Sequence, residues 1–287
     1  SQWYDRCCKR YSFGSEYVAG ICRYGLSNNT VKSITQDHLG FIWLGTFDGL
    51  CKFDGVDFTI FRHDLQDSLS IINNHVEVVA SVRDELWVGT KQGLNLYSYK
   101  ENNFRLCEWI LPTGERQKIT ESIKNIVVNQ GNVFVLTFSH ELLVRKKGCV
   151  FEPCDYKKNI EWLSISGYKE GLLIGHATDG LYVIDPDEMG IRAHFPFDSK
   201  ILSDCLYYSA NKDMIFLGFG IGYPSLAFRM NKENSLEKLE VRIPSSVKTI
   251  ADYKDETLFG TDGNGLMFFN EEGFAVFLYF LHDFLGT

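Results

Sequence analysis

The chain of 287 residues is 45% hydrophobic and 23% charged, and it contains 25 glycines, 14 tyrosines and 22 phenylalanines. This composition excludes a disordered, collagen-like or low-complexity chain and indicates a well-packed globular protein. The 37 acidic residues outnumber the 29 basic ones, for a formal net charge of −8, so a surface that follows nucleic-acid phosphates is not expected. The longest apolar stretch, residues 274–281, is much shorter than the roughly 20 residues that a membrane-spanning helix requires.

One block of sequence recurs along the chain. It consists of a β-like run, a polar turn, an aromatic-x-Gly-Thr segment and a Gly-Leu hairpin. The clearest copies are 31–50 and 76–94, and weaker copies follow at 132–137, 171–181, 215–218 and 257–266. The residues that define the repeat are Trp43, Gly45, Thr46, Trp87, Gly89, Thr90, Gly175, Gly218, Gly260 and Thr261.

The spacing of the repeat identifies the fold class. Its glycine position falls at residues 45, 89, 136, 175, 218 and 260, at intervals of 39 to 47 residues, which is the width of a four-stranded propeller blade. The first copy divides into four strands at 30–35, 41–46, 50–53 and 57–62, with a hairpin turn at Asp48-Gly49. The sequence therefore predicts an all-β fold, a β-propeller of four-stranded blades with seven blades.

We expect one propeller domain over residues 1–287, as a fragment of a longer protein. Its blades are predicted near 26–65, 70–112, 118–155, 158–197, 200–242 and 244–272, with a partial seventh blade at 273–287. The seventh blade is truncated, lacks a loop after Phe277, or is completed by an N-terminal strand within 11–22, which would close the ring without open edges.

The Trp-x-Gly element has a physical purpose in such a fold. Strands converge near a propeller axis and neighbouring sheets pack face to face, so there is little room for a side chain beside a large aromatic ring. Trp43 and Trp87 are expected to wedge between adjacent blades. Their replacement by alanine should then cost about 3–5 kcal/mol.

The segment from Leu26 to Leu50, with Asp37, Gly40 and Trp43-Leu-Gly45 in order, closely resembles the regulator-propeller repeat of bacterial hybrid two-component sensors. The motif departs from this pattern in the third blade, where Leu136 replaces the glycine, and in the fifth blade, after Gly218.

The resemblance implies the periplasmic sensor region of an inner-membrane histidine kinase. In such proteins, propellers precede an immunoglobulin-like segment, a membrane helix, a kinase and a receiver. It further implies a second propeller in the same chain and a homodimer of the full-length protein. Kinase chemistry and membrane contact would lie outside this chain, which is therefore not expected to be an enzyme.

A ligand site is expected where the repeat varies. The face with the second-to-third-strand turns, such as Phe47-Asp48, also carries loops such as 70–75, and variable turns on a rigid scaffold are suited to a specific site. If this propeller binds a carbohydrate, the candidate hydrogen-bonding and stacking residues are Lys91, His140, His176, Phe219, Tyr223, Asp262 and Asn264. The alternative is that these are ordinary solvated turn residues.

Cysteine and histidine spacing gives no metal site. The eight cysteines include no CxxC pair and the histidines are scattered, so no metal and no other cofactor is expected. Cys149 and Cys154 flank a turn and could form a disulfide in an oxidising compartment. Nucleophile motifs such as G-x-S-x-G and H-E-x-x-H are missing from the sequence, which leaves no positive evidence for catalysis.

Three functional hypotheses follow. In the first, the propeller detects oligosaccharides, or helps to detect them, and passes the signal on by a domain or dimer rearrangement. In the second, it is a propeller glycosidase or polysaccharide lyase with carboxylates at the mouth of the channel. In the third, it is a purely structural module for protein–protein interaction. No nucleic-acid partner is expected for this fragment.

Overall fold

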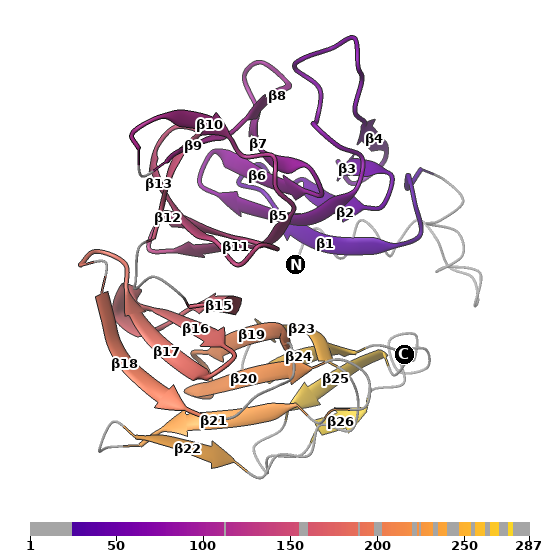
Figure 1. The fold of residues 1–287 in the computed structure, drawn as a ribbon. Coiled ribbons are helices and arrows are strands. Elements are labelled where there is room, and N and C mark those ends of the chain that lie inside the picture. The colour runs from indigo at the N-terminus through magenta and orange to yellow at the C-terminus, as the bar shows by residue number, and fades with distance from the viewer. Residues whose placement is uncertain are drawn as a thin grey trace, which may run out of the picture. The chain divides into compact units, whose positions relative to one another are not determined.

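The computed structural model describes residues 25–111, 113–154, 160–188, 190–197, 203–219, 223, 225–231, 235–239, 247–253, 256–261, 265–269 and 275–277. Their regular elements are strands and one 3-10 turn at Lys169–Gly171, which confirms the all-β prediction (Figure 1). Within these ranges, no helix has the length and apolar character needed to cross a bilayer. The chain divides into two compact units, 1–139 with 143–153, and 140–142 with 154–287.

In the described residues, the first unit contains three sheets. Two are four-stranded and antiparallel, with strands in chain order. They are formed by β1 (Val31–Gln36), β2 (Ile42–Thr46), β3 (Gly49–Phe53) and β4 (Phe58–Phe61), and by β5 (Val76–Val82), β6 (Glu85–Thr90), β7 (Gly93–Ser98) and β8 (Asn103–Leu106). The third sheet has six strands in the order β10-β9-β14-β13-β12-β11. Its strands are β9 (Glu108–Ile110), β10 (Arg116–Lys118), β11 (Ile123–Asn129), β12 (Asn132–Thr137), β13 (Leu142–Lys147) and β14 (Val150–Pro153).

The described part of the second unit contains three four-stranded sheets, again with strands in chain order. The first is formed by β15 (Trp162–Gly167), β16 (Leu173–Ala177), β17 (Gly180–Asp185) and β18 (Gly190–Pro196). The second is formed by β19 (Ser203–Ser209), β20 (Met214–Phe219), β21 (Leu226–Met230) and β22 (Leu236–Leu239). The third is formed by β23 (Val247–Tyr253), β24 (Glu256–Thr261), β25 (Gly265–Phe269) and β26 (Ala275–Phe277).

Two segments belong to different sheets from those that the predicted blade limits imply. The hairpin of β9 and β10 extends the third sheet, where β9 runs parallel to β14, although the sequence analysis places 108–112 in the second blade. Strand β26 pairs with β25 and completes the sixth sheet, although the seventh blade was predicted to begin at 273. The remaining parts of that predicted blade, 278–287 and 11–22, lie outside the described residues.

Three of the repeat glycines, Gly45, Gly89 and Gly218, lie where one sheet closely approaches the next. A Cβ atom added to Gly45 of β2 would lie 2.6 Å from the Cγ1 atom of Val76, the first residue of β5. One added to Gly89 of β6 would lie 2.7 Å from the Cγ2 atom of Ile123, the first residue of β11. Such distances are far below carbon–carbon contact distance, so the repeat needs glycine in order to seat the next sheet.

In the second unit, the space beside the repeat glycines is also filled, but by different groups. A Cβ atom on Gly218 of β20 would lie 2.7 Å from the carbonyl oxygen of Val247 in β23. At Gly175, the space is occupied by the ring of Trp162 from the same sheet, at 2.5 Å. In the third sheet, Leu136 replaces the glycine and is fully buried.

The repeat tryptophans fill the space between neighbouring sheets. Trp43 is fully buried in a cluster with Val79 and Leu86 of the second sheet, and its ring centroid lies 5.0 Å from that of Tyr97. Trp87 is buried in the same way among residues of the third sheet, including Ile126. Each large ring thus packs against the sheet that follows it in the chain.

Asp37 connects the first turn of the repeat to the packing of Trp43 by hydrogen bonds. Its Oδ1 atom accepts hydrogen bonds from the backbone N–H groups of Leu39 and Phe41, at 3.0 and 2.9 Å. Its Oδ2 atom accepts from Trp43 Nε1 at 2.7 Å and from the Tyr99 hydroxyl at 3.0 Å. Burial and this carboxylate together raise the pKa of Tyr99 above its usual range, so the phenol remains a donor.

We expect Gly89→Ala to lower the free energy of unfolding by about 1–3 kcal/mol, because its Cβ atom would overlap Ile123. Gly190→Ala is the matched control. Gly190 also lies in a strand, and its added Cβ atom would meet nothing closer than the Glu188 carbonyl oxygen at 3.9 Å. Urea denaturation of both variants tests this, and equal losses of stability would contradict the steric explanation.

Asp37→Ala should destabilise the chain by about 2–4 kcal/mol, because it leaves four donors without their shared acceptor, among them the buried Trp43 indole. Asp57→Ala, at an exposed turn position, should change stability by less than about 0.5 kcal/mol. Thermal unfolding followed by tryptophan fluorescence measures both. A loss at Asp37 no larger than at Asp57 would show that the carboxylate is dispensable.

Candidate functional site

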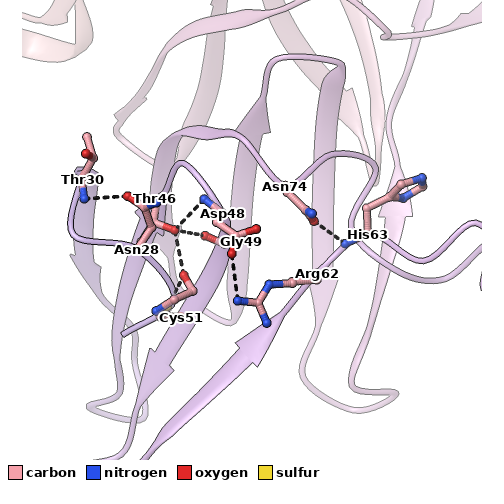
Figure 2. Close-up of polar contacts among 10 residues, drawn as sticks. Asn28, Thr30, Thr46, Asp48, Gly49, Cys51, Arg62, His63 and Asn74 are labelled. Atoms are coloured by element: carbon pink, nitrogen blue, oxygen red, sulfur yellow. Dashed lines mark hydrogen bonds and ion pairs between the residues drawn. The ribbon is translucent and has the colours of Figure 1, made fainter. Parts of the chain in front are cut away.

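In the first two sheets, the threonine of the Gly-Thr element holds the hairpin turn that follows it. Thr46 Oγ1 donates to the Gly49 carbonyl at 2.8 Å and accepts from the Asp48 N–H at 3.1 Å (Figure 2). Thr90 repeats both contacts in the second sheet, at 3.0 and 3.1 Å. The residue directly after each threonine is left out of this network, and its side chain can vary.

Further polar contacts fix the first turn against its surroundings. Asp48 Oδ2 accepts a hydrogen bond from Arg62 at 2.9 Å, and Asn74 Oδ1 accepts one from the His63 N–H at 2.7 Å (Figure 2). The Gly49 N–H donates to the Asn74 carbonyl at 2.7 Å. The Asp48 carboxylate is therefore engaged in an ion pair across the turn.

An exposed aromatic ring stands on this fixed turn. Phe47 is 43% exposed, and its ring centroid lies 4.2 Å from that of the His75 imidazole. The Lys32 ammonium lies 5.6 Å from the centroid of the same ring. We call Phe47, His75, Lys32, Glu77 and Lys91 the Phe47 patch.

Glu77 organises the polar part of the Phe47 patch. Its side chain is only 8% exposed, with one carboxylate oxygen 3.1 Å from His75 Nε2 and the other 3.3 Å from Lys32 Nζ. The Lys91 backbone N–H donates to the His75 carbonyl at 3.0 Å, which brings the exposed β6–β7 turn to the patch. Residues from four segments of the first unit thus make up the Phe47 patch.

The surroundings of His75 lower the pKa of its imidazole below the ordinary 6.5. Burial is the largest cause; Glu77 opposes it, and the positive charges of Lys91 and Lys32 reinforce it. His75 is therefore mainly neutral at pH 7. Since the unfolded chain binds this proton more readily, the contribution of His75 to stability is full above pH 6.5 and is lost as the pH falls below it.

The Phe47 patch has the composition of a small-molecule contact surface. It combines one exposed apolar ring with a few polar groups in fixed positions, the arrangement by which proteins orient ligands. Within the described residues, no cluster of three or more His, Cys, Asp or Glu side chains is suited to bind a metal ion.

The structure places the predicted ligand residues in both units. Lys91 is exposed and belongs to the Phe47 patch of the first unit. In the second unit, His140 is half-buried with Nδ1 2.9 Å from the Trp162 carbonyl oxygen, and Tyr223 is 50% exposed. Asp262 and Asn264 lie outside the described residues.

Two predicted ligand residues are buried, which corrects the sequence analysis. His176 has no exposed surface and its Nδ1 atom lies 2.8 Å from Ser203 Oγ. It follows the repeat glycine, where the first two sheets have Thr46 and Thr90, and both of these are also fully buried. His176 is thus the counterpart of the internal threonine.

Phe219 is 2% exposed and packs in a hydrophobic cluster with Leu206 and Phe228, so it offers no stacking surface. Strand β20 continues through Phe219, whereas the sequence analysis placed this residue in the turn. The alternation of the strand directs its side chain into the core.

Sequence reasoning passed over most of the Phe47 patch. Phe47 stands in a turn that the analysis placed on the binding face, and His75 ends the 70–75 loop assigned to that face. The signal that could have identified Phe47 is a large apolar residue directly after the Gly-Thr element. Nothing in the spacing indicated that Glu77 would be buried beside both His75 and Lys32.

The disulfide between Cys149 and Cys154 stays a prediction, and the structure places these two cysteines at opposite ends of strand β14. Cys149 packs with Cys107 in the hydrophobic cluster that also contains Trp87. Cys154 stands at the other end of strand β14, where its N–H donates to the Leu142 carbonyl at 2.7 Å.

Comparisons with known proteins identify the repeat. Residues 25–48 match the sequence model of a family described as "Two component regulator propeller", which confirms the resemblance found in the sequence. A curated protein, Histidine kinase P4 of Formosa agariphila, is 53% identical over 47 residues, which make up 16% of this chain and 3% of that protein.

Solved structures agree on the fold. The extracellular domain of a protein described as the hybrid two component system BT3049 of B. thetaiotaomicron aligns with a TM-score of 0.71 and 23% identity, over 93% of this chain and 36% of that one. The β-propeller domain of Myceliophteria thermophila Cps50 (Swd1) aligns with a TM-score of 0.63 and 11% identity, over 88% and 86% of the two chains. The predicted β-propeller fold is thereby confirmed. The chain spans about a third of the length of the sensor domain.

Lys91→Gln should raise the pKa of His75, because it removes one of the two cations that oppose protonation of the imidazole. An NMR titration of the His75 ring protons measures the change. Lys100→Gln, at an exposed position in the turn between β7 and β8, should leave that pKa unchanged. The same titration curve for all three proteins would contradict the electrostatic account of the patch.

Proposed function

We propose that this chain is a periplasmic sensor propeller of a hybrid two-component signalling protein, and that it binds oligosaccharides at the Phe47 patch. The observation that supports oligosaccharide binding is the exposed Phe47 ring, which is held on a rigid turn between polar groups. The regulator-propeller match at residues 25–48 and the likeness to an extracellular sensor domain support the first part.

A sugar ring has an apolar face and a rim of hydroxyl groups, and the Phe47 patch offers a complement to each. The Phe47 ring provides a flat apolar surface that is 43% exposed. Because Thr46 already fixes the turn, little conformational entropy is lost when a ligand is seated on the ring.

The polar groups of the patch suit the hydroxyl rim. The exposed Lys91 ammonium is a donor for sugar hydroxyl groups. Glu77 holds Lys32 and His75 beside the ring. The positive charges of Lys32 beside the ring and of Lys91 near His75 favour sugars that carry carboxylate or sulfate groups over neutral ones.

Signalling requires that the ligand bind two arrangements of the protein with different affinity. We infer that the propeller passes the signal on through a change in its packing against a second propeller of the same chain or against the partner in a homodimer. The kinase that reads this change lies outside the chain, so the chain is non-catalytic in this proposal.

The binding proposal can be tested by calorimetry with neutral and acidic oligosaccharides. A thermal-shift screen comes first, since a ligand at 100 times its Kd adds about 2.7 kcal/mol of stability. For a ligand so found, Phe47→Ala should weaken binding at least about tenfold, equivalent to roughly 1.4 kcal/mol. Val56→Ala is the matched control, because Val56 is 69% exposed in the β3–β4 turn, at the opposite end of the same sheet.

The outcomes separate the parts of the proposal. Tight binding by the Phe47→Ala protein would place the sugar elsewhere on the chain. No shift with any sugar, from a chain that melts cooperatively, would contradict oligosaccharide sensing by this propeller. Normal signalling by a full-length sensor that lacks residues 1–287 would contradict the sensor role itself.

A further inference from the structure

A cysteine marks the point where the chain leaves the second sheet for the third. Cys107 is the single residue between β8 and β9, and its side chain has no exposed surface. Its N–H donates to the Leu94 carbonyl of the second sheet at 2.8 Å, and its carbonyl accepts from the Ile119 N–H at 2.9 Å. Cys107 is therefore held firmly on both sides of the crossing.

A second cysteine, Cys149, lies next to Cys107 in the third sheet. Cys149 lies in the turn between β13 and β14 and is only half-buried. Strand β14 pairs with β9 in a parallel register that matches Val150 with Glu108, and the Glu108 N–H donates to the Cys149 carbonyl at 2.8 Å. One step back along this register sets Cys149 beside Cys107, and both side chains pack in the same hydrophobic cluster.

The backbone spacing suits a covalent bond between these two residues. Neighbouring strands lie about 4.8 Å apart, within the roughly 4.4–6.8 Å that separates the Cα atoms of a disulfide. Cys154 is less well placed, because the extended β14 strand carries it roughly 16 Å from Cys149, at about 3.3 Å per residue.

We propose that Cys107 and Cys149 are the site of a disulfide that forms when the protein is exposed to an oxidising compartment. The bond fastens the crossing between two sheets to the hairpin turn of the third. This inference is independent of sugar binding and goes beyond the proposed sensor role.

The two thiols are suited to successive roles in thiol–disulfide exchange with an oxidised dithiol carrier. The neighbouring Cys107 thiol lowers the pKa of Cys149, Arg105 and Arg145 add to this effect, and burial opposes it. Burial raises the pKa of Cys107. Cys149 is thus the more exposed and more acidic thiol, and it reacts first.

The reaction balances as an exchange. The Cys149 thiolate attacks one sulfur of the carrier disulfide, forms a mixed disulfide and releases one carrier thiolate. Cys107 then loses its proton and attacks the Cys149 sulfur, which releases the second carrier thiolate. In total, the protein loses two electrons and two protons, and the carrier disulfide is reduced to two thiols.

Peptide mapping of the purified 287-residue chain tests the proposal. The protein is incubated with oxidised glutathione, alkylated without reduction and digested with trypsin. Peptide 106–116, which contains Cys107, should be linked to peptide 148–157, which contains Cys149 and Cys154. The Cys154→Ser variant leaves one cysteine in the second peptide and should give the same link, whereas Cys149→Ser should abolish it.

Thermal unfolding provides a second readout. The oxidised wild-type protein should melt about 5–10 °C above the reduced one, because the bond closes a loop of more than 40 residues. This difference should persist in Cys154→Ser and disappear in Cys149→Ser, where only the half-buried partner is changed.

Two results would overturn the proposal. One is full alkylation of peptide 106–116 after treatment with oxidised glutathione. The other is a link from peptide 148–157 to a peptide that contains Cys7, Cys8, Cys22 or any cysteine other than Cys107. Neither result bears on the Phe47 patch, since sugar binding is not part of the measurement.

Discussion

The close approach between one sheet and the first strand of the next is the constraint on which the rest of the structure depends. Gly45 and Gly89 leave room for Val76 and Ile123, and the buried tryptophan two residues before each glycine fills the space beside this contact. The contact between each glycine and the next sheet fixes the position of the backbone as well as the side-chain packing. It therefore also determines where the following strands begin. The polar turns, the exposed ring at Phe47 and the loop that ends at His75 are consequences of that seating.

Sequence alone was sufficient for the fold class because the repeat encodes local geometry. Glycine, threonine and the Asp-Gly turn each serve one backbone requirement, and that requirement recurs at blade spacing. The sequence did not reveal that the 108–118 hairpin joins the third sheet. Its strands are only three residues long, and their partner is fixed by pairing with β14, about 40 residues further along the chain.

The candidate site was harder to predict for a related physical reason. Burial depends on which face of a strand a residue occupies, and a strand that runs one residue further than expected moves a side chain from solvent to core. Phe219 was misjudged in this way, and His176 was misjudged because it occupies the internal threonine position. Lys91 is exposed as expected, but its neighbour His75 is joined to it by a backbone contact that no spacing rule shows.

The added hairpin also changes what the third sheet presents to other chains. Its outermost strand is β10, whose residues Arg116, Gln117 and Lys118 are all exposed. Two charged side chains on this three-residue edge strand discourage the addition of a further strand. The corresponding edge strands of the other two sheets of the first unit are β4 and β8. A protein that recognised this unit by extending one of its sheets would therefore distinguish between blades that share the same repeat.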